Sequence, residues 1–229
     1  LASGKSITTI GIYCRNLRKL MNDAVRDGKL NRESYPFGKK EHGNFQISKS
    51  KKVKKALSTT DIRKLLKYKP QKLSPEQYYY DLWVFSYLGN GMNLKDICLL
   101  KHKYMQGNAI KFLRAKTAHS TSESKEIVIS LIPENKRIIS RWGTKPNNSE
   151  DYIFPIYYAG ITPEQQRVKV QALTKQVNKY MKLIAGKLGI EANITSYWAR
   201  HTFSTVLKRS GVNVSYISES LGHSNVSTT

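Results

Sequence analysis

The sequence predicts a mainly α-helical protein that carries one small antiparallel β-sheet. In most segments, apolar residues recur at intervals of three and four, which places them on one face of a helix. Near the middle of the chain, two short stretches alternate apolar and polar residues as strands do. The chain has 229 residues, of which 39% are apolar. It can therefore bury a substantial core, as one large domain or two small ones.

The first element is an amphipathic helix over residues 6–27, and Gly28 is suited to end it. Basic residues, among them Arg15 and Lys19, occupy the polar side of this helix. Two interpretations stay open for that side. It is either a solvated face or a face that lies along DNA. If the polar side lies along DNA, Arg15 and Lys19 are the candidate DNA-binding residues.

A lysine-rich stretch separates this helix from the rest of the chain. Residues 29–56 lack helical periodicity. A run of lysines is commonly a solvated tether, but in a basic protein it suits a linker that wraps a polyanion equally well. We expect a partial helical domain at 1–48, a basic linker at 49–57 and a second domain at 58–229. The candidate DNA-binding residues of the linker are Lys49, Lys51, Lys52, Lys54 and Lys55.

The second domain is expected to contain most of the helices and the sheet. Ser58 to Asp61 form a helix-start signal. A polar stretch at 114–125 joins the two strand patterns, which predicts a hairpin or a small three-stranded sheet. Residues 143–160 form a loop with two prolines. Further helices are expected at 77–89, 93–100, 133–142, 164–188, 195–210 and 214–221, and strands at 109–113 and 126–131.

The charge of the chain points to a polyanionic partner. Lys and Arg number 39 against 16 Asp and Glu, a formal net charge of +23. Double-stranded nucleic acid is the favoured partner, with an anionic membrane surface or plain solubility as alternatives. No run of 18 apolar residues predicts a membrane span, and no signal peptide is visible. Two cysteines, Cys14 and Cys98, predict neither a disulfide framework nor a zinc site, and they favour the cytosol.

Four residues stand out as a possible phosphate site. Arg200 lies in the helix predicted at 195–210 and His223 follows the one predicted at 214–221, and a guanidinium with an imidazole can hold one phosphate from two sides. Arg114 and Lys116 follow the first strand at a spacing that puts both side chains on one face of an extended chain. Each residue also has a plainer interpretation. Arg200 would form an ordinary ion pair, His223 would be structural, and Arg114 and Lys116 would be the polar flank of a hairpin. His201, beside Arg200, is expected to be structural.

The chain from about Ala56 to Thr229 resembles the catalytic domain of the tyrosine recombinases, or phage integrases. The resemblance rests on Ala-Arg-His-Thr-Phe-Ser-Thr at 199–205, on Gly-Val-Asn-Val at 211–214 and on Leu-Gly-His-Ser-Asn-Val-Ser-Thr-Thr at 221–229. Residues 1–48 resemble part of the family's helical, SAM-like core-binding domain. The combination of Arg-x-Lys-Thr at 114–117 with Ala-Arg-His-Thr at 199–202 resembles that of integrases of conjugative transposons and related mobile elements of gut bacteria.

The resemblance implies a set of catalytic residues, with two departures from the family pattern. Arg200, His223 and Lys116 match an arginine, a histidine and a lysine of the family. Tyr197 occupies a position usually held by histidine or lysine. Asn93 stands where the family has its first arginine, and we expect Arg114 to supply that guanidinium. The family's attacking tyrosine lies about nine residues after His223, beyond Thr229, so the fragment alone is expected to bind DNA without cutting it.

The implied activity is site-specific DNA recombination, integrating or excising a mobile element. A tyrosine would attack the DNA phosphodiester and form a 3′-phosphotyrosyl intermediate, without a metal or another cofactor. The resemblance further implies a homotetramer on paired DNA sites in the bacterial cytoplasm, associated with the nucleoid. A degenerate, non-catalytic DNA-binding regulator and a type IB topoisomerase-like enzyme are the alternatives.

Overall fold

The computed structural model describes residues 4–39, 44–48, 56–114 and 126–222. The chain divides into two compact units, Leu1–Lys54 and Lys55–Thr229. This division falls inside the predicted linker, whose lysines Lys49, Lys51, Lys52, Lys54 and Lys55 lie outside the described residues. The assignment of the first unit to a core-binding domain stays a prediction.

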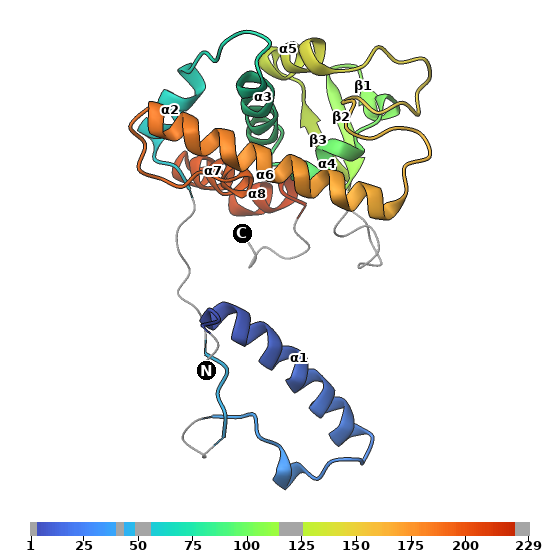
Figure 1. The fold of residues 1–229 in the computed structure, drawn as a ribbon, viewed down its shortest axis with the longest axis vertical. Helices are drawn as coiled ribbons and strands as arrows, with labels where there is room; N and C mark the ends of the chain where they lie inside the picture. The colour runs from blue at the N-terminus through green and yellow to red at the C-terminus, as the bar shows by residue number, and fades with distance from the viewer. Residues whose placement is uncertain (1–3, 40–43, 49–55, 115–125, 223–229) are drawn as a thin grey trace. The chain divides into compact units, whose positions relative to one another are not determined.

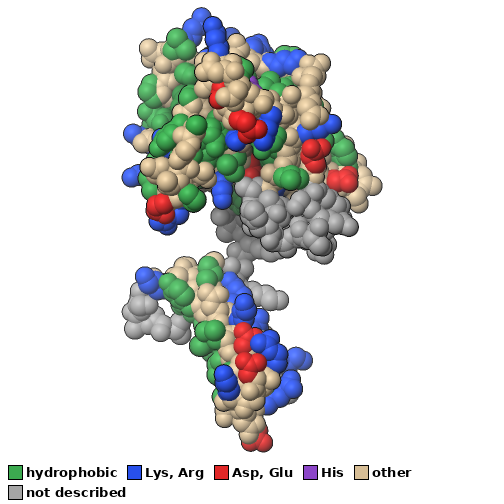
Figure 2. Space-filling model, turned by 90° about the vertical axis from the view of Figure 1, so that its right-hand side faces the viewer, with side chains coloured by type: hydrophobic (Ala, Val, Ile, Leu, Met, Phe, Trp, Pro, Cys, Tyr) green, Lys and Arg blue, Asp and Glu red, His purple; other side chains and the backbone are tan. Residues whose placement is uncertain are grey.

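The first unit is built on the helix α1 (Ile7–Arg26). The side chain of Ser6 caps its first turn by accepting a hydrogen bond from Thr9 N. Gly28, just after the helix, has a φ of 68°, the left-handed conformation that a glycine adopts without strain. Arg15 and Lys19 are exposed on this helix. Figure 2 shows Lys and Arg side chains along one side of the unit and hydrophobic ones along another.

The second unit contains the remaining α-helices of the described chain and its sheet (Figure 1). In order, they are α2 (Thr59–Lys67), α3 (Pro75–Leu88), α4 (Leu94–Leu99), β1 (Met105–Gln106), β2 (Ala109–Leu113), β3 (Glu126–Ser130), α5 (Pro133–Trp142), α6 (Pro163–Lys187), α7 (Ser196–Arg209) and α8 (Val214–Ser220). Two 3₁₀ turns, Arg32–Ser34 and His102–Tyr104, complete the described elements. The mainly α fold with a small antiparallel sheet is confirmed.

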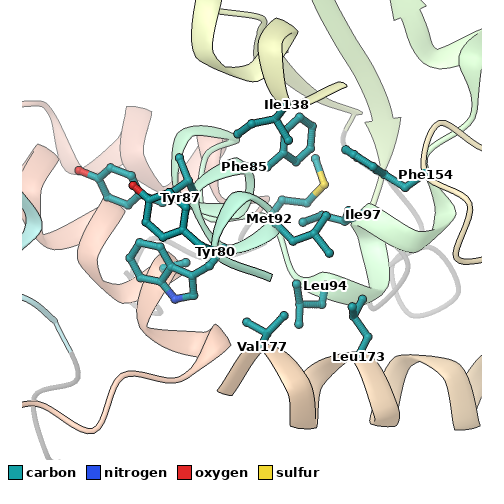
Figure 3. Packing of buried hydrophobic residues seen from close by; sticks show 14 of the residues in the cluster. Tyr80, Phe85, Tyr87, Met92, Leu94, Ile97, Ile138, Phe154, Leu173 and Val177 are labelled. Atoms are coloured by element: carbon teal, nitrogen blue, oxygen red, sulfur yellow. The ribbon is translucent and has the colours of Figure 1, made fainter. Parts of the chain in front are cut away.

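The central helix of the second unit is α3, which packs against α5, α6 and α7. Trp83 and Phe85 of this helix are fully buried, and Phe85 meets Phe154 edge to face. Figure 3 shows Leu94 and Ile97 of α4 beside Leu173 and Val177 of α6. Because α3 is apolar on nearly every side, it can serve as the axis around which the other helices pack.

The sheet has the order β1-β2-β3, and both pairs are antiparallel. Ile110 pairs with Ile129 and Phe112 with Ile127, and all four side chains are buried. The alternate residues of β3 are exposed, so only one face of this strand joins the core. Arg114 leaves the end of β2 on the buried side, two residues after Phe112.

Most predicted boundaries agree with the structure to within one residue, but one helix begins earlier and one strand was not located. The helix expected at residues 77–89 begins at Pro75, because Ser74 caps it and proline suits the first helical position. The strand β1 was not located by its own pattern, since two residues are too short to show alternation. It pairs with β2 across the turn at Gly107, which has a φ of 57°.

Candidate active site

The helix α7 carries the central residues of the predicted site, and its first turn is fixed by two other helices. The N-cap residue Thr195 makes no capping bond with its side chain within the described chain. The capping role is taken by Asn178 of α6, whose side-chain oxygen accepts a hydrogen bond from Ser196 N at 2.7 Å. Trp83 of α3 donates from Nε1 to Thr195 O at 3.0 Å. The start of α7 is therefore held by side chains of α6 and α3.

Arg200 points from α7 into the fold and is only 7% exposed. Its Nη1 donates to Gly91 O at 3.2 Å, and its Nη2 donates to Leu221 O. These two bonds connect the turn before α4 with the end of α8. The guanidinium is thus held in one orientation by two backbone carbonyls.

Gly91 allows this arrangement because it has no side chain. Its φ is 65°, and a β-carbon added there would lie 2.7 Å from Arg200 Cα. The left-handed conformation disfavours other residues, and the close approach excludes even a methyl group. A glycine is needed here for the backbone of α7 to reach the turn before α4.

Arg114 lies close to the same place from the side of the sheet. It is 9% exposed. A β-carbon added at Gly222 would lie 3.6 Å from Arg114 Cδ and 2.6 Å from Ile127 Cδ1. The end of α8 therefore packs directly on Arg114 and on β3. Since Leu221, the preceding residue, accepts a bond from Arg200, the two arginines flank the same turn.

The electrostatics of the site show that the two guanidinium groups lie near each other. Burial first, and then the positive charge of Arg114, lower the pKa of Arg200 to about 10, while Tyr197 and Asp96 act in the opposite direction. Asp96, in the first turn of α4, is buried as well. Two buried guanidinium groups close to each other favour binding of an anion.

Tyr197 is the most accessible residue of this group, with 51% of its surface exposed. It lies on α7, one turn before His201, and the two ring centroids are 4.5 Å apart in an edge-to-face arrangement. The half-buried His201 thus supports the ring of Tyr197. Tyr197 can offer its hydroxyl to a ligand in solvent, as a hydrogen-bond donor or acceptor.

The structure brings together Arg114, Tyr197 and Arg200 of the predicted site residues. Lys116 and His223 lie outside the described residues, so their predicted roles stay predictions. Asn93 is the N-cap of α4 and is half-buried, so no guanidinium comes from that position. Sequence reasoning missed the parts of Gly91, Leu221 and Asn178. Two act through backbone carbonyls, whose contacts no side-chain pattern predicts, and the third acts through an ordinary mid-helix amide.

In the part of the chain that the structure describes, no group of three or more His, Cys, Asp or Glu side chains could hold a metal ion. Within the same residues, no helix has both the length and the apolar character needed to cross a membrane.

Comparisons with known proteins place these observations in a family. Residues 55–229 match the Phage integrase family. The tyrosine recombinase XerD of Listeria monocytogenes is 25% identical over 242 aligned residues, which cover 99% of this chain and 71% of XerD. The chain therefore belongs to the phage integrase family, and its class is that of the tyrosine recombinases, enzymes of site-specific DNA recombination.

Two solved structures share the fold. The Tn1549 transposon integrase, in complex with a circular intermediate DNA, has a TM-score of 0.66 at 20% identity, over 98% of this chain and 74% of the integrase chain. The XerH site-specific recombinase, bound to its difH substrate, has a TM-score of 0.59 at 18% identity, over 99% of this chain and 61% of the XerH chain.

Proposed function

We propose that this chain binds double-stranded DNA and holds its scissile phosphate between Arg114 and Arg200. The observation that carries the proposal is the placement of two buried guanidinium groups on either side of the turn at Leu221 and Gly222. A guanidinium offers paired donors that match the nonbridging oxygens of a phosphate. Developing negative charge on these oxygens during cleavage would be stabilised most where water is excluded.

The proposed reaction exchanges one phosphoester bond for another. A tyrosine hydroxyl attacks phosphorus and gives up its proton, for which a neutral His223 is the proposed acceptor. The bond to the 5′ oxygen breaks, and a 3′-phosphotyrosyl ester forms. The departing 5′ oxygen takes a proton, for which Lys116 is the proposed donor. Tyr197 and His223 would add hydrogen bonds to the phosphate. Attack by the 5′ hydroxyl of a partner strand reverses the step, so no metal, nucleotide or other cofactor is required.

The attacking tyrosine is proposed to come from the segment after Thr229, about nine residues beyond His223, as the family resemblance implies. The reaction therefore has to be tested with the full-length protein.

DNA as the partner is supported by the charge of the chain and by the DNA complexes of proteins that share its fold. The formal net charge is +23. Both the Tn1549 integrase and XerH are described as complexes with DNA. Arg15 and Lys19, together with the lysines at 49–55, are proposed to contact the DNA backbone. We propose that the protein acts as a homotetramer on paired DNA sites. It would work at the nucleoid of a bacterium and move a mobile element.

The test is an incubation of the full-length protein with a nicked substrate that contains the ends of its element. The proposal predicts a covalent protein–DNA adduct that resists denaturation and is lost when the downstream tyrosine is replaced by phenylalanine. DNA binding without an adduct on any cognate substrate would favour the non-catalytic regulator instead. Relaxation of supercoiled DNA without a specific site would point to a topoisomerase.

A further inference from the structure

A buried hydrogen bond connects the beginning of the second unit to the helix that carries Arg200. Leu57 N donates to Thr202 Oγ1 at 3.1 Å, across 145 positions of sequence. The exposed fraction of Leu57 is 1% and that of Thr202 is 0%. A buried N–H group without an acceptor is costly, so this bond fixes the position of the chain where it enters the second unit.

Thr202 lies on the opposite side of α7 from Arg200. Two positions along an α-helix correspond to a rotation of about 200°. One side of the helix is therefore held by Leu57, and the other by the bonds from Arg200 to Gly91 and Leu221. Because α7 is hydrogen-bonded on two opposite sides, a shift of the chain at Leu57 is expected to shift α7 and the bonds of Arg200 with it.

Leu57 and the residue after it are both held in place. The Leu57 side chain belongs to the main hydrophobic core. The next residue, Ser58, already caps α2 by accepting a hydrogen bond from Asp61 N at 3.0 Å. A displacement of the chain at Leu57 would be transmitted to α2 and α7, because no flexible segment lies between the bond and either helix.

We infer that Thr202 is a positioning residue, which couples the chain arriving from the first unit to the placement of Arg200. The inference rests on the proposed function, in which Arg200 binds the scissile phosphate. When DNA engages both units, the arriving chain acts on α7 through the Leu57–Thr202 bond. The bond then favours the orientation of α7 in which Arg200 meets the phosphate.

The test compares Thr202→Val with Thr202→Ser in the full-length protein. Valine keeps the shape of threonine but accepts no hydrogen bond, whereas serine keeps the hydroxyl. We expect Thr202→Val to slow single-turnover cleavage at saturating DNA about tenfold, because small displacements of a catalytic group cost that much or more. The Kd for DNA stays within about twofold, and Thr202→Ser restores most of the rate.

A matched control is Thr174→Val on α6. The Thr174 hydroxyl donates to Val170 O within its own helix, and the residue is half-buried. This variant loses a threonine hydroxyl without touching α7, so it is expected to cleave at the wild-type rate. If Thr202→Val also cleaves at the wild-type rate and only lowers the Tm, Thr202 is a stabilising residue and the inference is wrong.

A second readout needs DNA binding but no cleavage. Hydrogen exchange of the α7 amides is measured with and without cognate DNA. The inference predicts that DNA slows exchange in α7 of the wild-type protein and that Thr202→Val abolishes this effect. Equal slowing in both proteins, or none in the wild type, would overturn it. If DNA slows exchange in α7 of the wild-type protein but no covalent adduct forms, the proposed reaction is contradicted. The coupling through the Leu57–Thr202 bond would still stand.

Discussion

The basic residues of the two units differ in how they are held. Arg114 and Arg200 of the second unit are buried, and Arg200 is bonded to two backbone carbonyls. Arg15 and Lys19 of α1 are exposed to solvent. The same formal charge can therefore serve two purposes. A buried, oriented guanidinium can recognise one phosphate, whereas an exposed cation attracts the DNA backbone as a whole and is screened by salt.

This difference in burial makes separate predictions for cleavage rate and for DNA affinity. Changes at the buried pair are expected to act on the rate of cleavage at saturating DNA. Changes on α1 are expected to act on the affinity and on its dependence on salt.

The largest effect is expected for Arg200→Lys. A lysine keeps the positive charge but cannot reach Gly91 O and Leu221 O while presenting a planar fork to the phosphate. We expect single-turnover cleavage to fall on the order of 1000-fold, with DNA affinity little changed. A similar loss of affinity and rate would instead show that Arg200 acts mainly as a general DNA-binding cation.

A smaller effect on rate, accompanied by a loss of stability, is expected for Gly91→Ala. The added methyl group would lie 2.7 Å from Arg200 Cα at a residue whose φ is 65°. We expect the free energy of unfolding to fall by about 2 kcal/mol or more and cleavage to fall about 100-fold. Denaturant unfolding and single-turnover cleavage measure the two effects.

Gly107→Ala is the matched control for that variant. Gly107 also has a positive φ, 57°, but an added β-carbon would meet nothing within 4 Å. It is expected to lose about 1 kcal/mol from backbone strain and to cleave normally. Equal effects of the two substitutions on cleavage would argue against a special contact between Gly91 and Arg200.

The smallest effect is expected for Arg15→Gln and Lys19→Gln. If each residue neutralises one phosphate, each substitution reduces the slope of log K against log salt by about 0.9. Cleavage at saturating DNA and low salt should stay near the wild-type rate. Binding isotherms at several salt concentrations measure the slope, and an unchanged slope would assign these residues to the solvated face instead.

Much of the fold was accessible from the sequence because the pattern of apolar residues is strong. The helix at Pro133–Trp142 was predicted with its observed bounds, and the strand at Ala109–Leu113 likewise. The strand β1 could not be found, since its two residues acquire their structure only by pairing with β2. The predicted start of α3 lies two residues after the observed one, because the Ser74 cap and Pro75 begin the helix before its aromatic pattern starts.

The site was only partly predictable for a physical reason. Arg200 and Arg114 were proposed from residue type and spacing together with the family resemblance. Their proximity depends on how β2, α7 and the end of α8 pack, which no local pattern encodes. The carbonyl of Leu221 and the amide of Asn178 act through backbone geometry and tertiary contact. Such contributions become visible only when the whole unit is folded.

The most direct test concerns Arg114 as the replacement for the arginine absent at Asn93. Single-turnover cleavage at saturating DNA is compared for full-length Arg114→Ala and Lys111→Ala. Lys111 is a cation on β2, three residues before Arg114. We predict that Arg114→Ala slows cleavage by about 100-fold or more while Lys111→Ala does not. Cleavage at the wild-type rate by Arg114→Ala would contradict the two-arginine site.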